Sequence, residues 1–136
     1  MSLTHLLDTS VYCQPLRKKP LAAVQRRWRE LGDAGLGISA ICELEVLQGL
    51  EMKNSKRLWE MYRSILRDRL PILPVDRAVA ESYAPMAAAV RAKGQPRPQF
   101  DLLIAATAAA HGLTIATCDP GHFVGIDGVK TEDWSA

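Results

Sequence analysis

Short apolar runs alternate along this chain with longer segments in which apolar residues recur every three or four positions. The short runs occupy residues 3–7, 35–38, 71–75 and 113–117, and they stand next to polar residues, glycine or proline. Runs of this length and character are typical of strands buried in a sheet. The closing segment 128–134 is expected to add one more strand, at the edge of that sheet.

The longer segments carry the period of amphipathic helices and cover residues 21–31, 41–50, 58–66, 79–90 and 101–111. Residues suited to cap or end these helices stand beside them, namely Gly32, Ser39, Asn54 or Ser55, Asp76 and Gly112. Because strands alternate with helices at this spacing, we expect an α/β fold with a central, mostly parallel sheet flanked by helices.

The chain is long enough for one hydrophobic core and too short for two ordinary domains, since it has 136 residues of which 48% are hydrophobic. We therefore expect a single domain over residues 1–136. The longest apolar segment, around residues 102–110, is far shorter than the ~20 residues that span a bilayer. Cys13, Cys42 and Cys118 are widely spaced and odd in number, which predicts free thiols in a reducing cytoplasm.

Four acidic residues stand at the edges of the apolar segments and are candidates for one site. In chain order they are Asp8, Glu45, Asp101 and Asp119. The carboxyl ends of parallel strands meet at one edge of a sheet, so acids that follow distant strands can converge there. Clustered carboxylates repel unless a cation lies among them, and Mg²⁺ and Mn²⁺ prefer oxygen ligands. The pattern therefore predicts a site for Mg²⁺ or Mn²⁺ held by these four residues.

The charge balance is compatible with a nucleic-acid substrate. Seventeen Lys and Arg residues face 15 Asp and Glu residues, and setting the four site acids aside leaves an excess of six positive charges. Such an excess suits contacts to a phosphate backbone, although ordinary solvated charge explains it equally well. Arg91, Lys93 and Arg97 lead toward Asp101 and are the preferred contacts to such a backbone. The basic cluster 17–19 fits a solvated face better than a surface that follows the backbone.

Five motifs carry a resemblance to a known family. They are LLDTSV at 6–11, SAICELEVLQG at 39–49, FDLLIAATAAAHGLTIATCD at 100–119, HF at 122–123 and EDW at 132–134. Together they resemble the PIN-domain family, in particular its VapC-type ribonuclease toxins, in the right order over nearly the whole chain. Each motif is weak alone, but five in register make a chance match improbable.

The resemblance implies a Mg²⁺- or Mn²⁺-dependent endoribonuclease that hydrolyses RNA by metal-activated water. Its four acids would be Asp8, Glu45, Asp101 and Asp119, acting both as metal ligands and in catalysis. Family members usually act in the cytoplasm as the toxin of a VapBC-type pair, form homodimers, and are silenced by a small VapB-like antitoxin whose tail enters the site. An alternative is an inactive PIN-like module that binds RNA or protein, but its mark would be a missing carboxylate, and none is missing.

The second acid has a close competitor in Glu43. The family pattern places six steps between a Ser or Thr and the acid, then four to a Gly, and Ser39, Glu45 and Gly49 satisfy it. Residues two apart on a helix point about 200° from each other, so only one of the pair can face the site. We therefore assign Glu45.

Supporting roles are less sharply defined. Ser10 stands where the family places a hydroxyl that bonds a site carboxylate, and it also suits a turn; Thr117 could support Asp119 or only fill a strand position. Cys118 stands where relatives often carry Arg, and Asp119 where many carry Asn. The stretch 41–66 could form a groove for an antitoxin segment or pack into the core. The chain's histidines, His5, His111 and His122, share no metal-ligand spacing and are expected in structural positions.

Overall fold

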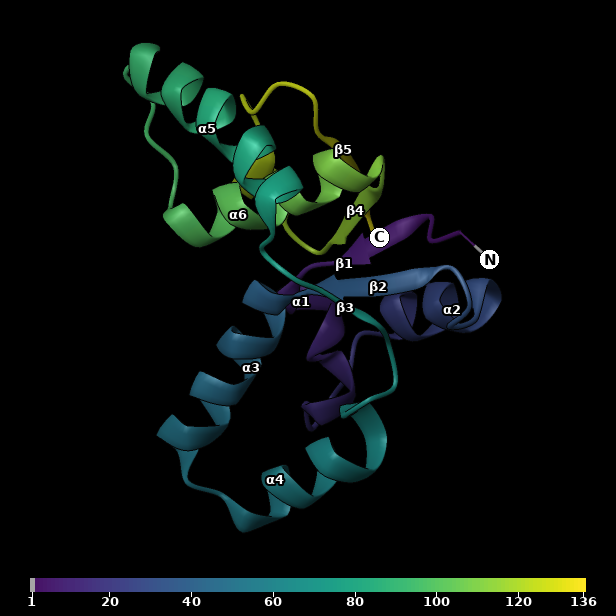
Figure 1. Cartoon of the computed structure of the whole chain (residues 1–136). Coiled ribbons are helices and arrows are strands. Elements are labelled where there is room, and N and C mark those ends of the chain that lie inside the picture. Colours follow the sequence, from purple (N-terminus) through teal and green to yellow (C-terminus); the bar gives the residue numbers. More distant parts are fainter. Residues whose placement is uncertain (1) are drawn as a thin grey trace.

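The computed structural model describes residues 2–136, and its centre is a sheet of five parallel strands in the order β3-β2-β1-β4-β5 (Figure 1). This arrangement confirms the predicted α/β fold with a central parallel sheet. The strands are β1 (His5–Leu7), β2 (Leu36–Ser39), β3 (Ile72–Leu73), β4 (Thr114–Thr117) and β5 (Lys130–Asp133). The closing segment supplies β5 at one edge, as predicted.

The helices follow the predicted periodic segments, with short turns added at the strand ends. They are α1 (Thr9–Tyr12), η1 (Gln14–Leu16), α2 (Ala22–Leu31), α3 (Ala40–Lys53), α4 (Lys56–Met61), η2 (Tyr62–Leu66), α5 (Arg77–Ala92), α6 (Gln99–His111) and η3 (Pro120–Phe123). Ser39 caps α3 by accepting from the Cys42 amide at 3.0 Å. Ser55 rather than Asn54 caps α4, because Asn54 adopts the left-handed conformation that ends α3.

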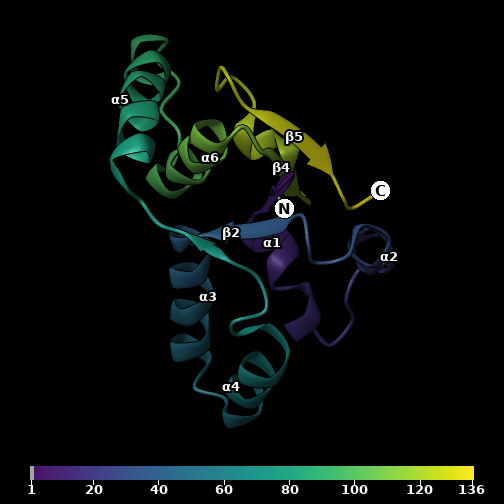
Figure 2. The same cartoon turned by 45° about the vertical axis from the view of Figure 1, so that its right-hand side comes forward.

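Neighbouring strand residues belong to two separate cores. Helices cover both sides of the sheet, with α1, α2 and α3 on one side and α5 and α6 on the other (Figure 2). Leu7 and Ala116 pack with α1, α2 and α3 on one face. Leu6 and Ile115 pack with α5 and α6 on the other. Burial on both faces explains why the strand sequences are short continuous apolar runs rather than alternating patterns.

The segment predicted as one helix over 58–66 divides into α4 and a π-helical turn, η2. The Arg67 amide bonds the Tyr62 carbonyl at 2.9 Å, which is the wider spacing of a π turn. This spacing keeps both Tyr62 and Leu66 in the core. The Tyr12 hydroxyl donates to the Leu66 carbonyl at 3.1 Å, so a side chain compensates the irregular backbone.

The closing EDW motif has a structural role in the sheet. Glu132 on β5 accepts from Arg27 Nη2 at 2.8 Å and from Trp134 Nε1 at 2.8 Å, and it lies 3.3 Å from His5 Nε2. These contacts join α2, β1 and the C-terminal segment. His5 therefore occupies a structural position, as predicted.

Candidate active site

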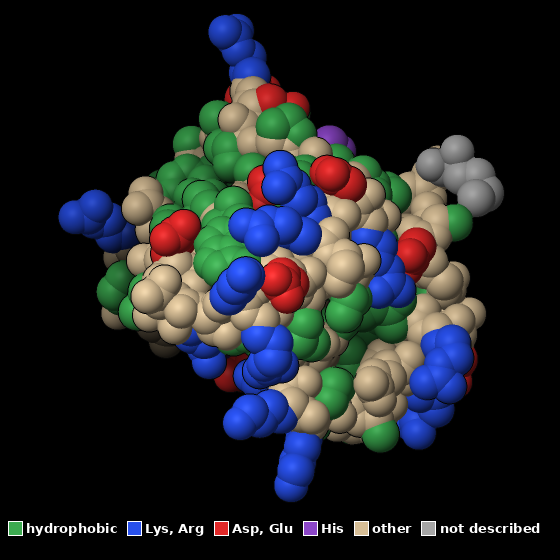
Figure 3. All heavy atoms as spheres, turned by 90° about the horizontal axis from the view of Figure 1, so that it is seen from below, with side chains coloured by type: hydrophobic (Ala, Val, Ile, Leu, Met, Phe, Trp, Pro, Cys, Tyr) green, Lys and Arg blue, Asp and Glu red, His purple; other side chains and the backbone are tan. Residues whose placement is uncertain are grey.

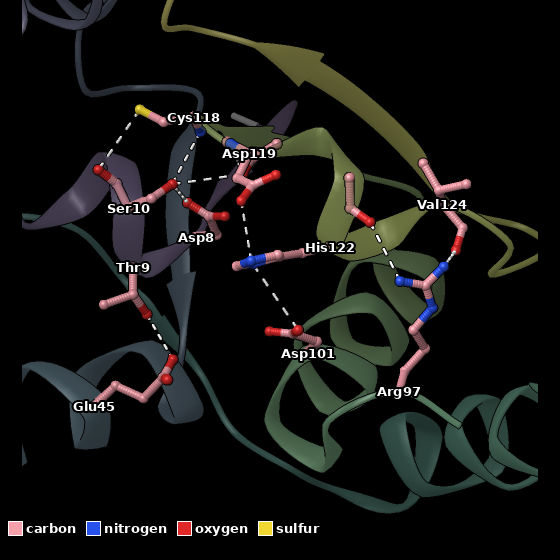
Figure 4. Close-up of polar contacts among 12 residues, drawn as sticks. Asp8, Thr9, Ser10, Glu45, Arg97, Asp101, Cys118, Asp119, His122 and Val124 are labelled. Atoms are coloured by element: carbon pink, nitrogen blue, oxygen red, sulfur yellow. Dashed lines mark hydrogen bonds and ion pairs between the residues drawn. The ribbon is translucent and has the colours of Figure 1, made fainter. Parts of the chain in front are cut away.

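Asp8, Asp101 and Asp119 lie at the carboxyl edge of the sheet, brought there by three elements distant in sequence (Figure 4). Asp8 directly follows β1, and Asp119 follows the neighbouring strand β4 after one residue. Asp101 lies in the first turn of α6, which packs against η3. The predicted convergence of these acids thus follows from the strand order, because β1 and β4 are adjacent and parallel.

Asp8 is a buried carboxylate, with only 5% of its surface exposed. Its Oδ1 accepts from Ser10 Oγ at 2.5 Å and from the Val11 amide at 3.2 Å, so it also caps α1. Burial raises the pKa of Asp8, while these hydrogen bonds favour the ionised form and oppose the shift. The expected bond between the Ser10 hydroxyl and a site carboxylate is present.

A short polar network ties the end of β4 to the start of α1. Ser10 Oγ accepts from the Cys118 amide at 2.9 Å while donating to Asp8. Thr117 Oγ1 accepts from the Asp119 amide at 2.9 Å. Thr117 is also fully buried at the end of β4, so it fills a strand position as well as supporting Asp119. The backbone that presents Asp119 is therefore fixed relative to Asp8.

His122 lies between two of the acids, contrary to the expectation of a purely structural loop residue. Its Nε2 stands 3.0 Å from Asp119 Oδ2, and its Nδ1 stands 4.0 Å from Asp101 Oδ2. A signal was available in the sequence, since the HF motif follows Asp119 at the helical spacing of three residues. This contact was not predicted, because only the metal-ligand spacing among the three histidines was tested and not the spacing between His122 and the acids.

The pKa of Asp101 is set by opposing influences. Burial raises this pKa, the positive charge of His122 and Arg97 lowers it, and the negative charge of Asp119 raises it. The Asp101 side chain is 21% exposed, against 56% for Asp119. The solvent exposure of the three carboxylates therefore increases from Asp8 through Asp101 to Asp119. This leaves room for a ligand on the Asp119 side of the site.

Glu45 lies beside these three acids rather than among them (Figure 4). Its Oε1 accepts from Thr9 Oγ1 at 2.7 Å, and Thr9 directly follows Asp8. Glu43 is instead close enough to Tyr12 to contribute to the raised pKa of that phenol, after the larger effect of burial. Glu45 thus bonds the hydroxyl next to Asp8, and its assignment as the second acid stays a prediction. The role of Thr9 was not foreseen, because a hydroxyl next to Ser10 gives no distinct pattern.

Titration of Asp8 should make the stability of the fold depend on pH. Well below pH 3.8, the ordinary pKa of an aspartic acid, the carboxyl is neutral in the folded and unfolded chain and contributes little difference. As pH rises the unfolded chain ionises first, because burial raises the folded-state pKa, so ionisation favours unfolding until the pH passes that pKa. Thermal melts of the wild type and Asp8→Asn should differ more at about pH 7 than at about pH 4. An equal difference at both pH values would contradict a raised pKa.

The donor set fits a hard divalent cation by its chemistry. Within residues 2–136, no three Asp, Glu, His or Cys side chains stand close enough to hold one ion in their present conformations. The available ligands are nevertheless carboxylate oxygens, which Mg²⁺ and Mn²⁺ prefer. His122 now lies between Asp101 and Asp119, where a positive charge is favourable. Because Asp119 and His122 are both more than half exposed, they have room to rearrange around an ion.

The three candidate RNA contacts differ in their surroundings. Arg91 is exposed near the end of α5, and Lys93 is exposed and pairs with Asp127 at 3.4 Å. Arg97 is partly buried, and its guanidinium donates to the carbonyls of Gly121 and Val124. Arg91 and Lys93 are exposed and therefore remain candidates for RNA contact, whereas Arg97 already bonds the protein backbone.

An open groove of about 780 Å³ runs between the α1–η1 segment and the helices α3 and α4, with Glu45 and Thr9 among its lining residues. The hydrophobic part of its lining includes Leu16, Val46, Leu50 and Leu58. Its basic residues are Arg17, Lys18, Lys19, Lys53 and Arg57. Figure 3 views the molecule from the side of α3 and α4 and shows Lys and Arg side chains gathered around hydrophobic surface. Residues of 41–66 thus serve both the core and the groove.

In the part of the chain that the structure describes, none of the helices has the length and apolar character needed to cross a bilayer.

Comparison with known proteins yields a consistent set of relatives. The family model for the PIN domain matches residues 5–128, a range that includes all four candidate acids. The chain is 29% identical over 136 residues to the tRNA(fMet)-specific endonuclease VapC of Shigella flexneri, covering 98% of this chain and 99% of that protein. It is 33% identical over 135 residues to toxin FitB of Neisseria gonorrhoeae, covering 95% and 97%. DNA-bound VapBC from Salmonella typhimurium matches with a TM-score of 0.84 at 28% identity, over 97% of this chain and 98% of that chain.

Proposed function

Because the chain belongs to the PIN-domain family, we propose that it is a metal-dependent endoribonuclease and the toxin of a VapBC-type toxin–antitoxin pair. Its relatives of nearly equal length are named as an endonuclease and as a toxin. The observation that carries the proposal is the convergence of Asp8, Asp101 and Asp119 at the carboxyl edge of the sheet. Burial at Asp8 and Asp101 makes their negative charge costly without a cation.

Mg²⁺ or Mn²⁺ would be held by Asp8, Asp101 and Asp119, with Glu45 as the fourth acid. When bound, such an ion supplies a positive charge for the phosphate oxygen and lowers the pKa of a water molecule. The residues around the acids hold them in place. Ser10 orients the Asp8 carboxylate through its hydroxyl. Such hydrogen bonds fix the oxygen atoms before the ion arrives, which reduces the reorganisation that binding requires.

Glu45 is linked to the site through Thr9, whose hydroxyl donates to the Glu45 carboxylate at 2.7 Å. Thr9 follows Asp8 directly and begins α1, so this bond couples α3 to the end of β1. A carboxylate held in this position can accept a proton from the attacking water or orient that water through a hydrogen bond. RNA would approach over the accessible Asp119 side of the site.

We place the protein in the cytoplasm as a homodimer bound by a VapB-like antitoxin. The groove beside Glu45 supports the antitoxin assignment, because its lining combines hydrophobic with basic residues. The groove also includes Glu45 and Thr9, which connect it with the site. This combination suits an amphipathic, acidic helix laid into a groove. Purification of the native complex should yield a small acidic partner. Recovery of this chain from its native host without any small partner would contradict the assignment.

Metal binding can be tested without any assumption about the RNA. Calorimetric titration with Mn²⁺ should show binding to the wild type, and Asp101→Asn should weaken it by about tenfold or more, the scale on which changes around a metal alter its affinity. Asp68→Asn is a matched control, because it removes the same charge at an exposed residue whose left-handed backbone (φ 62°) suits Asn. Equal Mn²⁺ affinity for all three proteins would exclude Asp101 as a ligand.

A further inference from the structure

Arg97 lies in the loop between α5 and α6, two residues before α6 begins and four before Asp101. The residues from 91 to 100 are exposed except Arg97, which is partly buried. A basic side chain that only met RNA would be expected to stay in solvent like its neighbours. Its partial burial indicates that Arg97 has partners within the protein.

Those partners are backbone carbonyls on either side of η3. Arg97 Nη1 donates to the Gly121 carbonyl at 3.3 Å, and Nη2 donates to the Val124 carbonyl (Figure 4). A Cβ atom placed on Gly125 would come within 3.5 Å of Arg97 Nη2, so the guanidinium lies directly against this segment. The planar guanidinium suits this arrangement, because it presents several N–H donors in fixed directions.

The segment that Arg97 holds carries part of the active site. Asp119 immediately precedes η3, and His122 within η3 contacts both Asp119 and Asp101. Within this segment the His122 amide bonds the Asp119 carbonyl at 3.1 Å, and the two later bonds are longer, at 3.4 Å from the Val124 amide to the Gly121 carbonyl and 3.3 Å from the Ile126 amide to the Phe123 carbonyl. The two bonds from Arg97 therefore add to a backbone network that is weakest after His122.

We propose that Arg97 is a positioning residue, which fixes η3 against the start of α6 and so sets the distance between Asp119 and Asp101. The effect of Arg97 on catalysis rests on the proposed function, whereas its effect on the position of η3 does not. This positioning role competes with the prediction that Arg97 contacts RNA, because the two N–H groups that bond these carbonyls cannot also serve a phosphate. Arg97 acts on the reaction through Asp119 and Asp101 rather than by touching the substrate.

Two substitutions separate the geometric role from simple charge. Arg97→Gln removes the charge and the fork of donors, while Arg97→Lys keeps the charge but loses the fork. Arg77→Gln is the matched control, because Arg77 is exposed at the start of α5, away from the candidate RNA contacts, and its loss changes the net charge equally. Both Arg97 variants should lower kcat by about tenfold or more with KM changed less than about twofold, as expected when reacting groups are misplaced. Arg77→Gln should leave kcat unchanged.

Hydrogen exchange of the protein without RNA gives a readout independent of cleavage. Both Arg97 variants should exchange faster than wild type at the amides of residues 120–126, and Arg77→Gln should not. If Arg97→Gln fails to fold, Arg97→Lys alone decides the comparison. Unchanged exchange, or a raised KM with unchanged kcat, would overturn the proposal in favour of direct RNA contact. If the wild type cleaves nothing, the proposed function falls while the exchange comparison still decides the role of Arg97.

Discussion

Replacing Asp8 with asparagine should abolish RNA cleavage while raising the melting temperature of the metal-free protein near neutral pH. The variant keeps the side-chain shape but removes a carboxylate that is only 5% exposed and that would bind the metal. We expect the cleavage rate to fall by about 10²–10³-fold or more, the scale for losing one group that stabilises charge in a transition state. The fold should gain stability because burial disfavours the ionised form of Asp8.

The opposite signs of these two effects make the prediction specific. A substitution that merely damaged the core would lower activity and stability together. Asp68→Asn should change neither, since Asp68 is exposed and lies in the loop after η2. Cleavage by Asp8→Asn at the wild-type rate, with metal present, would remove Asp8 from the site.

Glu45→Gln should reduce cleavage by about 10²-fold, whereas Glu43→Gln should leave it close to wild type. The two residues lie two positions apart on α3, so each variant removes one charge from the same helix turn. Glu45 reaches the site through its bond from Thr9, while the negative charge of Glu43 raises the pKa of the Tyr12 and Tyr62 phenols, after the larger effect of burial. The measurement is the single-turnover cleavage rate at saturating metal.

The pair of variants also tests the boundaries of the site. If Glu43→Gln lost activity and Glu45→Gln retained it, the assignment of the second acid would be reversed. A Thr9→Val variant should fall between Glu45→Gln and wild type, because it keeps the carboxylate but removes the hydroxyl that orients it. Melting temperatures close to wild type would show that the lost rate does not come from unfolding.

Much of the fold could be predicted from local sequence patterns. Ser39 and Asp76 are read as helix caps from residue type alone, and the structure shows both accepting the expected backbone bonds. The lengths of the strands are harder to predict from the sequence. The run 71–75 yields only the two residues of β3, because Pro71 and Pro74 lack the N–H that a longer ladder needs. The π turn after α4 depends on tertiary contacts from Tyr12, which no local pattern specifies.

In the candidate site, too, some residues were predictable from local patterns and others depend on tertiary packing. Asp8 and Asp119 were predictable because each ends a buried strand, and parallel strands end at one edge. The contacts of His122 and Arg97 were not, since both depend on how η3 folds back against α6. Phe123, the last residue of η3, is buried in the core, and Gly125 has a positive φ of 85°, so packing and a glycine backbone hold this loop together with the bonds from Arg97. Which partner a polar side chain meets is thus decided by packing elsewhere.

The most direct test of the account is cleavage of a mixed RNA pool by purified protein free of antitoxin. Reactions should contain Mg²⁺, Mn²⁺ or EDTA, with Asp8→Asn beside the wild type and the new RNA ends sequenced. We expect metal-dependent cutting at a limited set of positions, lost with EDTA and lost in the variant. Cutting that persists in EDTA or in Asp8→Asn, or no cutting by folded wild type with either metal, would contradict a metal-dependent ribonuclease centred on these acids.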